Sequence, residues 1–175
     1  ERQHELLTRV EGKTFHNDPK LWQKENVLPY IEVYEDKNSL AFKNLDTKKL
    51  SLYKAYFKTG LLIEVVKDTK NINVLLNQFI NENKLEEKVL IASRFKNIVE
   101  NIRRVKPRWL TSISTNDIYI AIVLKKLFLE RLAPIPGDFL FLKESIIEKR
   151  WWSEIPIKEL QKRNKALITA KEGGY

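Results

Sequence analysis

Two glutamates stand inside segments that are mostly apolar. Glu32 lies in YIEVYE and Glu64 lies in LLIEVV. A carboxylate buried in this way becomes neutral unless a metal, a lysine or a proton compensates its charge. A pair of such carboxylates at strand ends could also hold Mg²⁺ or Ca²⁺, because both ions take oxygen ligands. We therefore predict that Glu32 and Glu64 converge on one pocket, either as metal ligands or as partners of a structural ion pair.

Few other side chains suit acid–base chemistry near neutral pH. The chain has two histidines, His4 and His16, and no cysteine. His16 lies in TFHNDPK, near a turn, where it is either structural or catalytic. Lys67 follows LLIEVV and could face a phosphate or lie on the surface. Ser93 ends KVLIAS and could contact a ligand or cap the next helix.

The elements that must position these residues alternate between strand-length and helical segments. The apolar segments of strand length are YIEVYE, LAFK, LLIEVV, KVLIAS, WLTSIS, DFLFL and ALITA. Most of them are continuously apolar, which is typical of parallel strands covered on both faces by helices. The pattern predicts a single α/β domain over residues 1–175, with ligands at the carboxyl ends of the strands. The core should include Ile63, Val65, Leu90, Ile91, Phe139 and Phe141.

Helical periodicity is clearest in two segments between the strands. One apolar stripe contains Ile72, Leu75, Leu76, Phe79 and Ile80, and another contains Ile98, Val99, Ile102 and Val105. Pro107 should end the second helix, and TND before Ile118 should cap a third. The third helix lies in the apolar segment IYIAIVLKKLFLERLA. This segment is too short to span a bilayer, so we expect a buried helix. Asn164 should take a left-handed conformation where a last helix ends.

Charge and composition limit the partners. The chain carries 32 Lys and Arg against 23 Asp and Glu, a formal net charge of +9. Such a surface concentrates anions at low salt. Basic and aromatic residues are not interleaved as in a nucleic-acid module, so nucleic acid is not the expected partner. Trp151 and Trp152, which follow Arg150, could form an exposed pair or cover a core. The sequence shows no transmembrane segment or signal peptide and leaves the localisation open.

The segments LLIEVVKD, KVLIASRF and FKNIVENIRRVKPRWLTSIS resemble the central part of the glycerophosphodiester phosphodiesterase family. PGDFLFLKESII and LQKRNKALITA are similar to its penultimate units, so the resemblance covers roughly residues 30–170. It implies a TIM-type (β/α) barrel and metal-dependent hydrolysis of glycerophosphodiesters or related phosphate diesters. It also implies Glu32 and Glu64 as metal ligands, with Mg²⁺ or Ca²⁺ as the cofactor, and Lys67 and Ser93 near the substrate phosphate.

The departures from the family pattern concern the catalytic motifs. The family has a strand ending in His-Arg-Gly, a Glu-x-Asp strand and a His-Asp pair. This chain has no His-Arg-Gly, Tyr34 stands at the Asp position of the Glu-x-Asp strand, and Lys43 and Asn44 stand where the His-Asp pair belongs. Thr169 lies nearest to the place of the family's late tryptophan. His16 is the remaining catalytic candidate, because Lys43 would need a strongly lowered pKa to act as a base.

Two further expectations follow from these departures. The pattern ends before the family's closing strand and the chain has no methionine. We therefore expect a partial or degenerate barrel, incomplete at its ends.

Two classes of function remain open. One is a metal-dependent phosphodiesterase acting on a small phosphodiester or a lipid headgroup. The other is a catalytically degenerate barrel that binds a phosphorylated ligand, a membrane surface or a protein partner.

Overall fold

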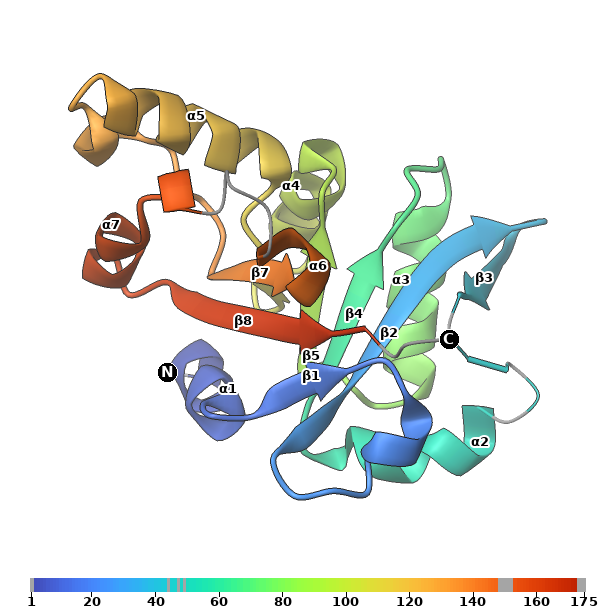
Figure 1. Cartoon of the computed structure of the whole chain (residues 1–175). Helices are drawn as coiled ribbons and strands as arrows, with labels where there is room; N and C mark the ends of the chain where they lie inside the picture. The colour runs from blue at the N-terminus through green and yellow to red at the C-terminus, as the bar shows by residue number, and fades with distance from the viewer. Residues whose placement is uncertain (1, 44, 47, 49, 148–152, 173–175) are drawn as a thin grey trace.

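Parallel strands curve around a common axis and form a nearly closed barrel, shown in Figure 1. The computed structural model describes residues 2–43, 45–46, 48, 50–147 and 153–172. Within them the parallel strands are β1 (Thr14–His16), β2 (Val27–Asp36), β4 (Leu61–Val65), β5 (Val89–Ser93), β6 (Leu110–Thr111), β7 (Phe139–Lys143) and β8 (Ala166–Lys171). Their order is β6-β5-β4-β2-β1-β8-β7, and a parallel bridge between Ser112 and Phe139 joins the two ends. The fold is therefore α/β, of the TIM type.

One further strand and a set of helices surround the barrel. Strand β3 (Ser39–Phe42) pairs antiparallel with β2 across a two-residue turn in which Lys37 and Asn38 have positive φ, as a tight hairpin requires. The α-helices are α1 (Arg2–Val10), α2 (Leu50–Tyr53), α3 (Ile72–Glu82), α4 (Lys96–Val105), α5 (Thr115–Lys126), α6 (Glu144–Ile147) and α7 (Ile157–Lys162). The 3₁₀ helices are η1 (Pro19–Leu21), η3 (Lys54–Lys58) and η4 (Glu130–Leu132). No helix among the described residues is both long and apolar enough to cross a membrane.

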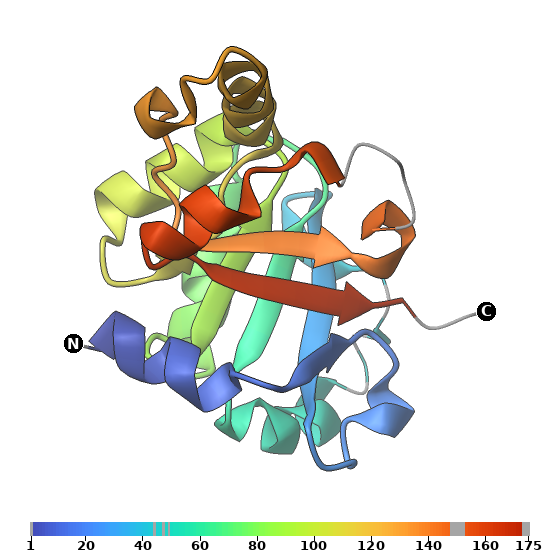
Figure 2. The ribbon, with the colours of Figure 1, turned by 60° about the vertical axis from the view of Figure 1, so that its left-hand side comes forward.

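Alternate residues of the strands divide the apolar side chains between two sides of the barrel wall. One cluster fills the barrel and includes Phe15, Leu28, Tyr30, Leu62, Leu90 and Phe139. A second cluster lies outside, where Ile31, Ile63 and Ile91 pack with apolar residues of α3 and α4. Leu6 and Val10 of α1 belong to the interior cluster, and Figure 2 shows α1 at one end of the barrel. They lie close to Gly60, just before β4, so α1 covers the amino ends of the strands.

The structure confirms much of the expected core. Ile63, Val65, Leu90, Ile91 and Phe139 are buried, and Phe141 is partly buried. The two predicted helices lie at α3 and α4, although Val105 at the end of α4 is exposed. Asn164 has a φ of 56°, as expected for a left-handed residue after a helix.

Strand β1 is part of the barrel that sequence reasoning did not find. This strand has only three residues, too few for a periodic pattern. It pairs in parallel with both β8 and β2 and so fills the gap between them. Strand β8 therefore has a parallel partner on each side, β1 and β7.

The expected buried helix is also corrected. In α5, Ile118, Ala121 and Ile122 are buried, but Tyr119 and Val123 are 54% and 56% exposed, because one face alone packs on the barrel. Its cap is Ser114 rather than TND: the Ser114 hydroxyl accepts a hydrogen bond from the Asp117 backbone N–H. Trp151 and Trp152, which we expected to form an exposed pair or to cover a core, lie outside the described residues.

The barrel closes at a seam between β6 and β7 that depends on Gly137. A Cβ atom at this position would lie 2.5 Å from the Ile113 backbone nitrogen and 2.6 Å from the Ser112 carbonyl carbon. Both are backbone atoms that cannot rotate away. Next to it, the Asp138 backbone N–H donates to the Thr111 carbonyl at 2.8 Å, and the Asp138 carboxylate accepts from the Thr111 backbone N–H at 2.9 Å. Any side chain at residue 137 would push these two strands apart.

We expect Gly137→Ala to lower the free energy of unfolding by about 1–3 kcal/mol, the usual cost of overpacking. Gly12→Asn is the matched control, since Gly12 has open space around its Cβ position and a φ of 71°, which asparagine tolerates. Urea denaturation of both variants measures the effect. A Gly137→Ala protein as stable as the control would contradict the close approach at the seam.

Candidate functional site

Glu32 and Glu64 lie side by side near the carboxyl ends of two neighbouring strands. The parallel register of β2 and β4 places Glu32 directly opposite Glu64. Side chains alternate along a strand, so Glu32 shares the inner side of β2 with Tyr30, a member of the interior cluster. The Tyr30 hydroxyl contacts both carboxylates, at 3.0 Å from Glu32 Oε1 and in a hydrogen bond with Glu64 Oε2. The two carboxylates therefore meet as predicted, whereas their predicted role as metal ligands stays a prediction.

The cation between the two carboxylates is Lys143, at the end of β7. Its Nζ lies 2.9 Å from Glu32 Oε1 and 2.8 Å from Glu64 Oε2. It also lies 3.3 Å from Glu172 Oε1, just beyond β8. Lys43 adds a second positive charge, with its Nζ 2.8 Å from Glu32 Oε2. Both oxygens of Glu32 are therefore engaged by ammonium groups.

These contacts shift the pKa values in different directions. Burial raises the pKa of Glu64 above its ordinary range, even though Lys143 opposes this shift. Burial acts in the same sense on Glu32, but the hydrogen bonds from Lys43 and Lys143 outweigh it and lower the pKa of that carboxyl. For Lys143, burial is outweighed by the two glutamates, so its pKa is raised. Burial, followed by the neighbouring carboxylates, raises the pKa of Tyr30, which stays a phenol.

A small cavity of about 70 Å³ opens beside Glu64 and Lys143. Its other lining residues include Ser93, Arg94 and Thr115, which come from the end of β5 and the start of α5. Two basic residues therefore line this cavity, together with one carboxyl group, and the guanidinium of Arg94 lies 4.7 Å from the centre of the Phe95 ring. Sequence reasoning missed Lys143 and Arg94. The available signals were the alternation of Phe139, Phe141 and Lys143 in DFLFLK, and the arginine after Ser93 in SRF.

Ser93 borders the cavity, but its hydroxyl already has two backbone partners. The Ser93 hydroxyl donates to the Val65 carbonyl at 3.0 Å and accepts from the Phe95 backbone N–H at 3.2 Å. The Ser93 backbone N–H donates to the Ser112 hydroxyl at 3.1 Å. These contacts tie the ends of β4, β5 and β6 together. The expected helix cap is corrected, because the N-cap residue of α4 is Phe95 and Ser93 binds the backbone of that residue. A phosphate contact by Ser93 stays a prediction.

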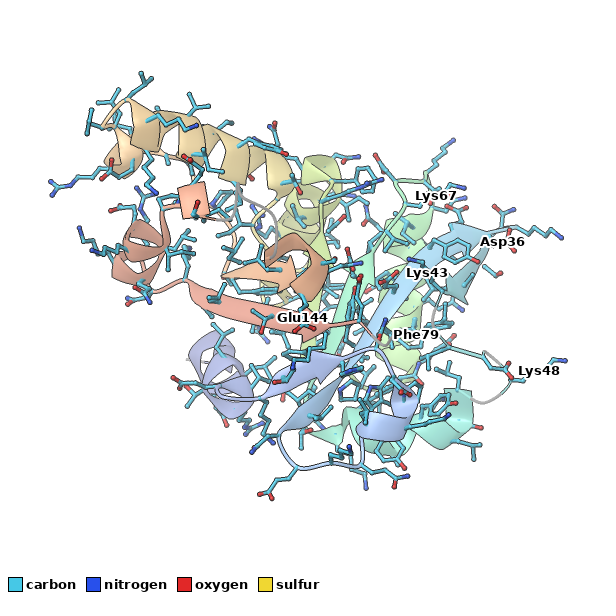
Figure 3. The ribbon with its side chains drawn as sticks, viewed as in Figure 1. Asp36, Lys43, Lys48, Lys67, Phe79 and Glu144 are labelled. Atoms are coloured by element: carbon cyan, nitrogen blue, oxygen red, sulfur yellow. The ribbon has the colours of Figure 1, made fainter. Side chains whose placement is uncertain are left out.

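Lys67 is exposed on the loop that follows β4. Figure 3 shows it there, while Glu144 lies beside the ends of β7 and β8. Among the ion pairs of the described residues, none joins Lys67 to Glu32 or Glu64. Its predicted role at a phosphate stays open, and the lysines that do reach the glutamates are Lys43 and Lys143. Asn44 lies outside the described residues.

His16 ends β1, the strand before the one that carries Glu32. Its Nδ1 accepts a hydrogen bond from the Asp18 backbone N–H at 3.0 Å, so the neutral ring carries its proton on Nε2. The His16 carbonyl accepts from the Trp22 indole at 2.7 Å. Burial lowers the pKa of His16, so the ring is neutral at physiological pH. In this tautomer His16 presents a donor, and a role as general base would require the Asp18 contact to break.

The donor set does not suit a divalent cation. Mg²⁺ and Ca²⁺ take oxygen ligands at about 2.0–2.6 Å and commonly use several carboxylates. Here the Lys143 ammonium already lies between the carboxylates of Glu32 and Glu64. No group of three or more His, Cys, Asp or Glu side chains arranged to hold a metal occurs among the residues that the structure describes. A metal at this position would have to displace Lys143.

The opposite pKa shifts of the two glutamates predict opposite effects of isosteric variants. The pKa of Glu32 falls below 4.5 on folding, so its stabilising contribution is present above pH 4.5 and is lost as the pH falls through the folded value. The pKa of Glu64 rises on folding, so its ionised form opposes folding, and this effect is relieved as the pH falls.

At pH 7 we expect Glu32→Gln to lower the free energy of unfolding by about 1–3 kcal/mol, and Glu64→Gln to leave it unchanged or raise it. Urea denaturation at pH 7 and at pH 4 checks both the sizes and the pH dependence. Equal losses in the two variants at pH 7 would contradict the assignment of charges.

Comparisons with known proteins support the assignment of the fold. No family model matches the chain, and no curated protein matches it in sequence. Among solved structures, a glycerophosphodiester phosphodiesterase from Parabacteroides distasonis is similar, with a TM-score of 0.57 and 12% identity. The match covers 90% of this chain and 83% of that one. At this level of identity the likeness shows the TIM-type fold that both chains share.

Proposed function

We propose that this protein is a phosphodiesterase-like barrel that binds phosphate diesters at the carboxyl ends of its strands and hydrolyses them. The observation that supports this proposal is the small cavity bordered by Lys143, Arg94 and Glu64. Ligands of parallel β/α folds bind at this end of the strands. Glycerophosphodiesters and related headgroup esters are the expected substrates, because the similar solved structure is a glycerophosphodiester phosphodiesterase.

Charge and size favour one phosphate group as the occupant of the cavity. Arginine can donate two parallel hydrogen bonds to phosphate oxygens, and lysine provides a point charge. The cavity also borders the N-terminus of α5 at Thr115, and helix N-termini favour anions. Its volume of about 70 Å³ is far below the roughly 300–1,000 Å³ of a pocket for a whole drug-sized ligand. The phosphate would enter the cavity, and the alcohol groups of the diester would remain outside.

Glu64 is the group at the cavity with a pKa displaced in the direction that a general acid needs. A raised pKa keeps a carboxyl group protonated closer to neutral pH, and such carboxyls serve as proton donors in hydrolases. In the proposed reaction the bond between phosphorus and the leaving oxygen breaks, and that oxygen takes the Glu64 proton. The attacking hydroxyl or water forms the new bond to phosphorus and releases its own proton to solvent water, and Glu64 takes a proton back from solvent before the next turnover. The resulting Glu64 carboxylate is stabilised by Lys143, 2.8 Å away.

The test of this function is hydrolysis of glycerophosphocholine and glycerophosphoinositol, followed by ³¹P NMR. Turnover by the wild-type protein that is lost in Glu64→Gln supports the enzyme. Binding of the diester without turnover would identify a catalytically degenerate module instead. If neither the diesters nor inorganic phosphate bind, the proposed site is wrong.

Two substitutions test whether phosphate binds in the cavity beside Lys143 or at Lys67, the position expected from the sequence. Arg94→Ala should weaken binding of inorganic phosphate about tenfold, because it removes charge-assisted hydrogen bonds, while Lys67→Ala should change it less than twofold. Lys70→Ala is the control, since Lys70 is exposed on the same loop as Lys67. Calorimetric titration measures all three variants. A larger loss in Lys67→Ala than in Arg94→Ala would place the phosphate over the loop after β4.

A further inference from the structure

The Lys143 ammonium group has carboxylate oxygens on several sides. An ammonium has three N–H donors, and oxygens of Glu32, Glu64 and Glu172 lie 2.9, 2.8 and 3.3 Å from Nζ. The Lys143 side chain is 15% exposed, and Nζ lies 5.8 Å from the centre of the Tyr30 ring. Such a lysine is fixed in position, unlike a surface lysine that samples many conformers.

The position of Lys143 in the barrel explains how its ammonium reaches these carboxylates. The glutamates belong to β2 and β4, while Lys143 belongs to β7, which is not a neighbour of either strand. The lysine therefore reaches them from another part of the barrel wall. Phe141 lies two residues earlier on β7, and its ring centre is 5.6 Å from that of Tyr30. This packing holds the end of β7 against β2 and directs the ammonium between the two carboxylates.

A divalent cation and this ammonium would compete for the same oxygens. A metal bound by both glutamates would need Glu32 Oε1 or Glu64 Oε2, or would have to displace Lys43 from Glu32 Oε2. It would also lie within a few ångströms of a buried positive charge, and repulsion between like charges is strong where water is scarce. The raised pKa of Lys143 keeps that charge in place over the physiological range.

We infer that Lys143 is the resident cation of this site, that it excludes a divalent cation from Glu32 and Glu64, and that the neighbouring cavity takes a phosphate ester without a metal. The exclusion of the metal depends on the contacts of Lys143 with both glutamates, supported by the contact of Lys43 with Glu32. The statement about the phosphate ester rests on the proposed function.

Removal of the ammonium should turn the site into a metal site. Lys143→Ala leaves Glu32, Glu64 and Glu172 without their common partner, and carboxylate oxygens are suitable ligands for Mn²⁺. We expect calorimetric titration with MnCl₂ to give no stoichiometric binding to the wild-type protein below about 1 mM. The Lys143→Ala protein should bind one Mn²⁺ at least about tenfold more tightly than wild type, and Lys143→Ala/Glu64→Gln should lose this binding.

Lys171→Ala is the matched control. Lys171 lies on the adjacent strand β8, is exposed, and is 3.9 Å from Glu144 rather than from the central pair. Its loss should leave Mn²⁺ binding as in wild type. Stoichiometric Mn²⁺ binding to the wild-type protein that Glu64→Gln abolishes would overturn the inference. So would a folded Lys143→Ala protein with no gain in affinity.

A second measurement does not depend on the folding of the variant. In NMR spectra of the wild-type protein, Mn²⁺ should cause no selective broadening of the backbone amide signals of Glu32 and Glu64, and selective broadening would overturn the inference. Binding of inorganic phosphate to the wild-type protein should be the same before and after EDTA, and a loss on chelation would overturn the metal-free site. If phosphate binds under neither condition, the proposed function fails, while the Mn²⁺ titrations still decide the role of Lys143.

Discussion

The need to neutralise two neighbouring carboxylates inside a barrel governs the arrangement of its mouth. Glu32 and Glu64 face each other across β2 and β4, where burial disfavours their charged forms. Three groups complete the cluster: Lys143 from β7, the Tyr30 hydroxyl and Lys43. Each partner comes from a different element or register position. The cluster can therefore form only when the strands are correctly aligned.

The same cluster bears on the kinds of charge that the strand ends of a β/α barrel can hold. A barrel with carboxylates at its strand ends suits a hard cation, and a lysine from β7 can supply positive charge at the same place. The two solutions differ in what they permit. A metal ion can exchange ligands and accept a phosphate oxygen directly, whereas an ammonium attracts a phosphate through hydrogen bonds and charge.

The sequence was informative where residues are regularly spaced and poorly informative where contacts are distant. The continuous apolar strands and the stripes of α3 and α4 predicted parallel strands covered by helices, and the family resemblance implied their closure into a barrel. The charges inside YIEVYE and LLIEVV predicted the convergence of Glu32 and Glu64. The buried pair also implied a compensating group. Its identity could not be read, because Lys143 is 79 residues after Glu64 and is one of 32 basic residues. β1 escaped detection for a different reason: its three residues are defined by their neighbours rather than by their own pattern.

The pairing of β1 with β8 has a consequence for how the chain folds. Phe15 and Ala170 are register partners although most of the described chain lies between them. Contacts of such long separation are costly to form early, because a long loop must close before they are gained. Strands β2, β4 and β5 can pair through short connections, but β1 finds its second neighbour only after β8 has been synthesised. Until then a sheet edge and the apolar interior are exposed, and exposed edges and apolar surface favour aggregation of an incomplete chain.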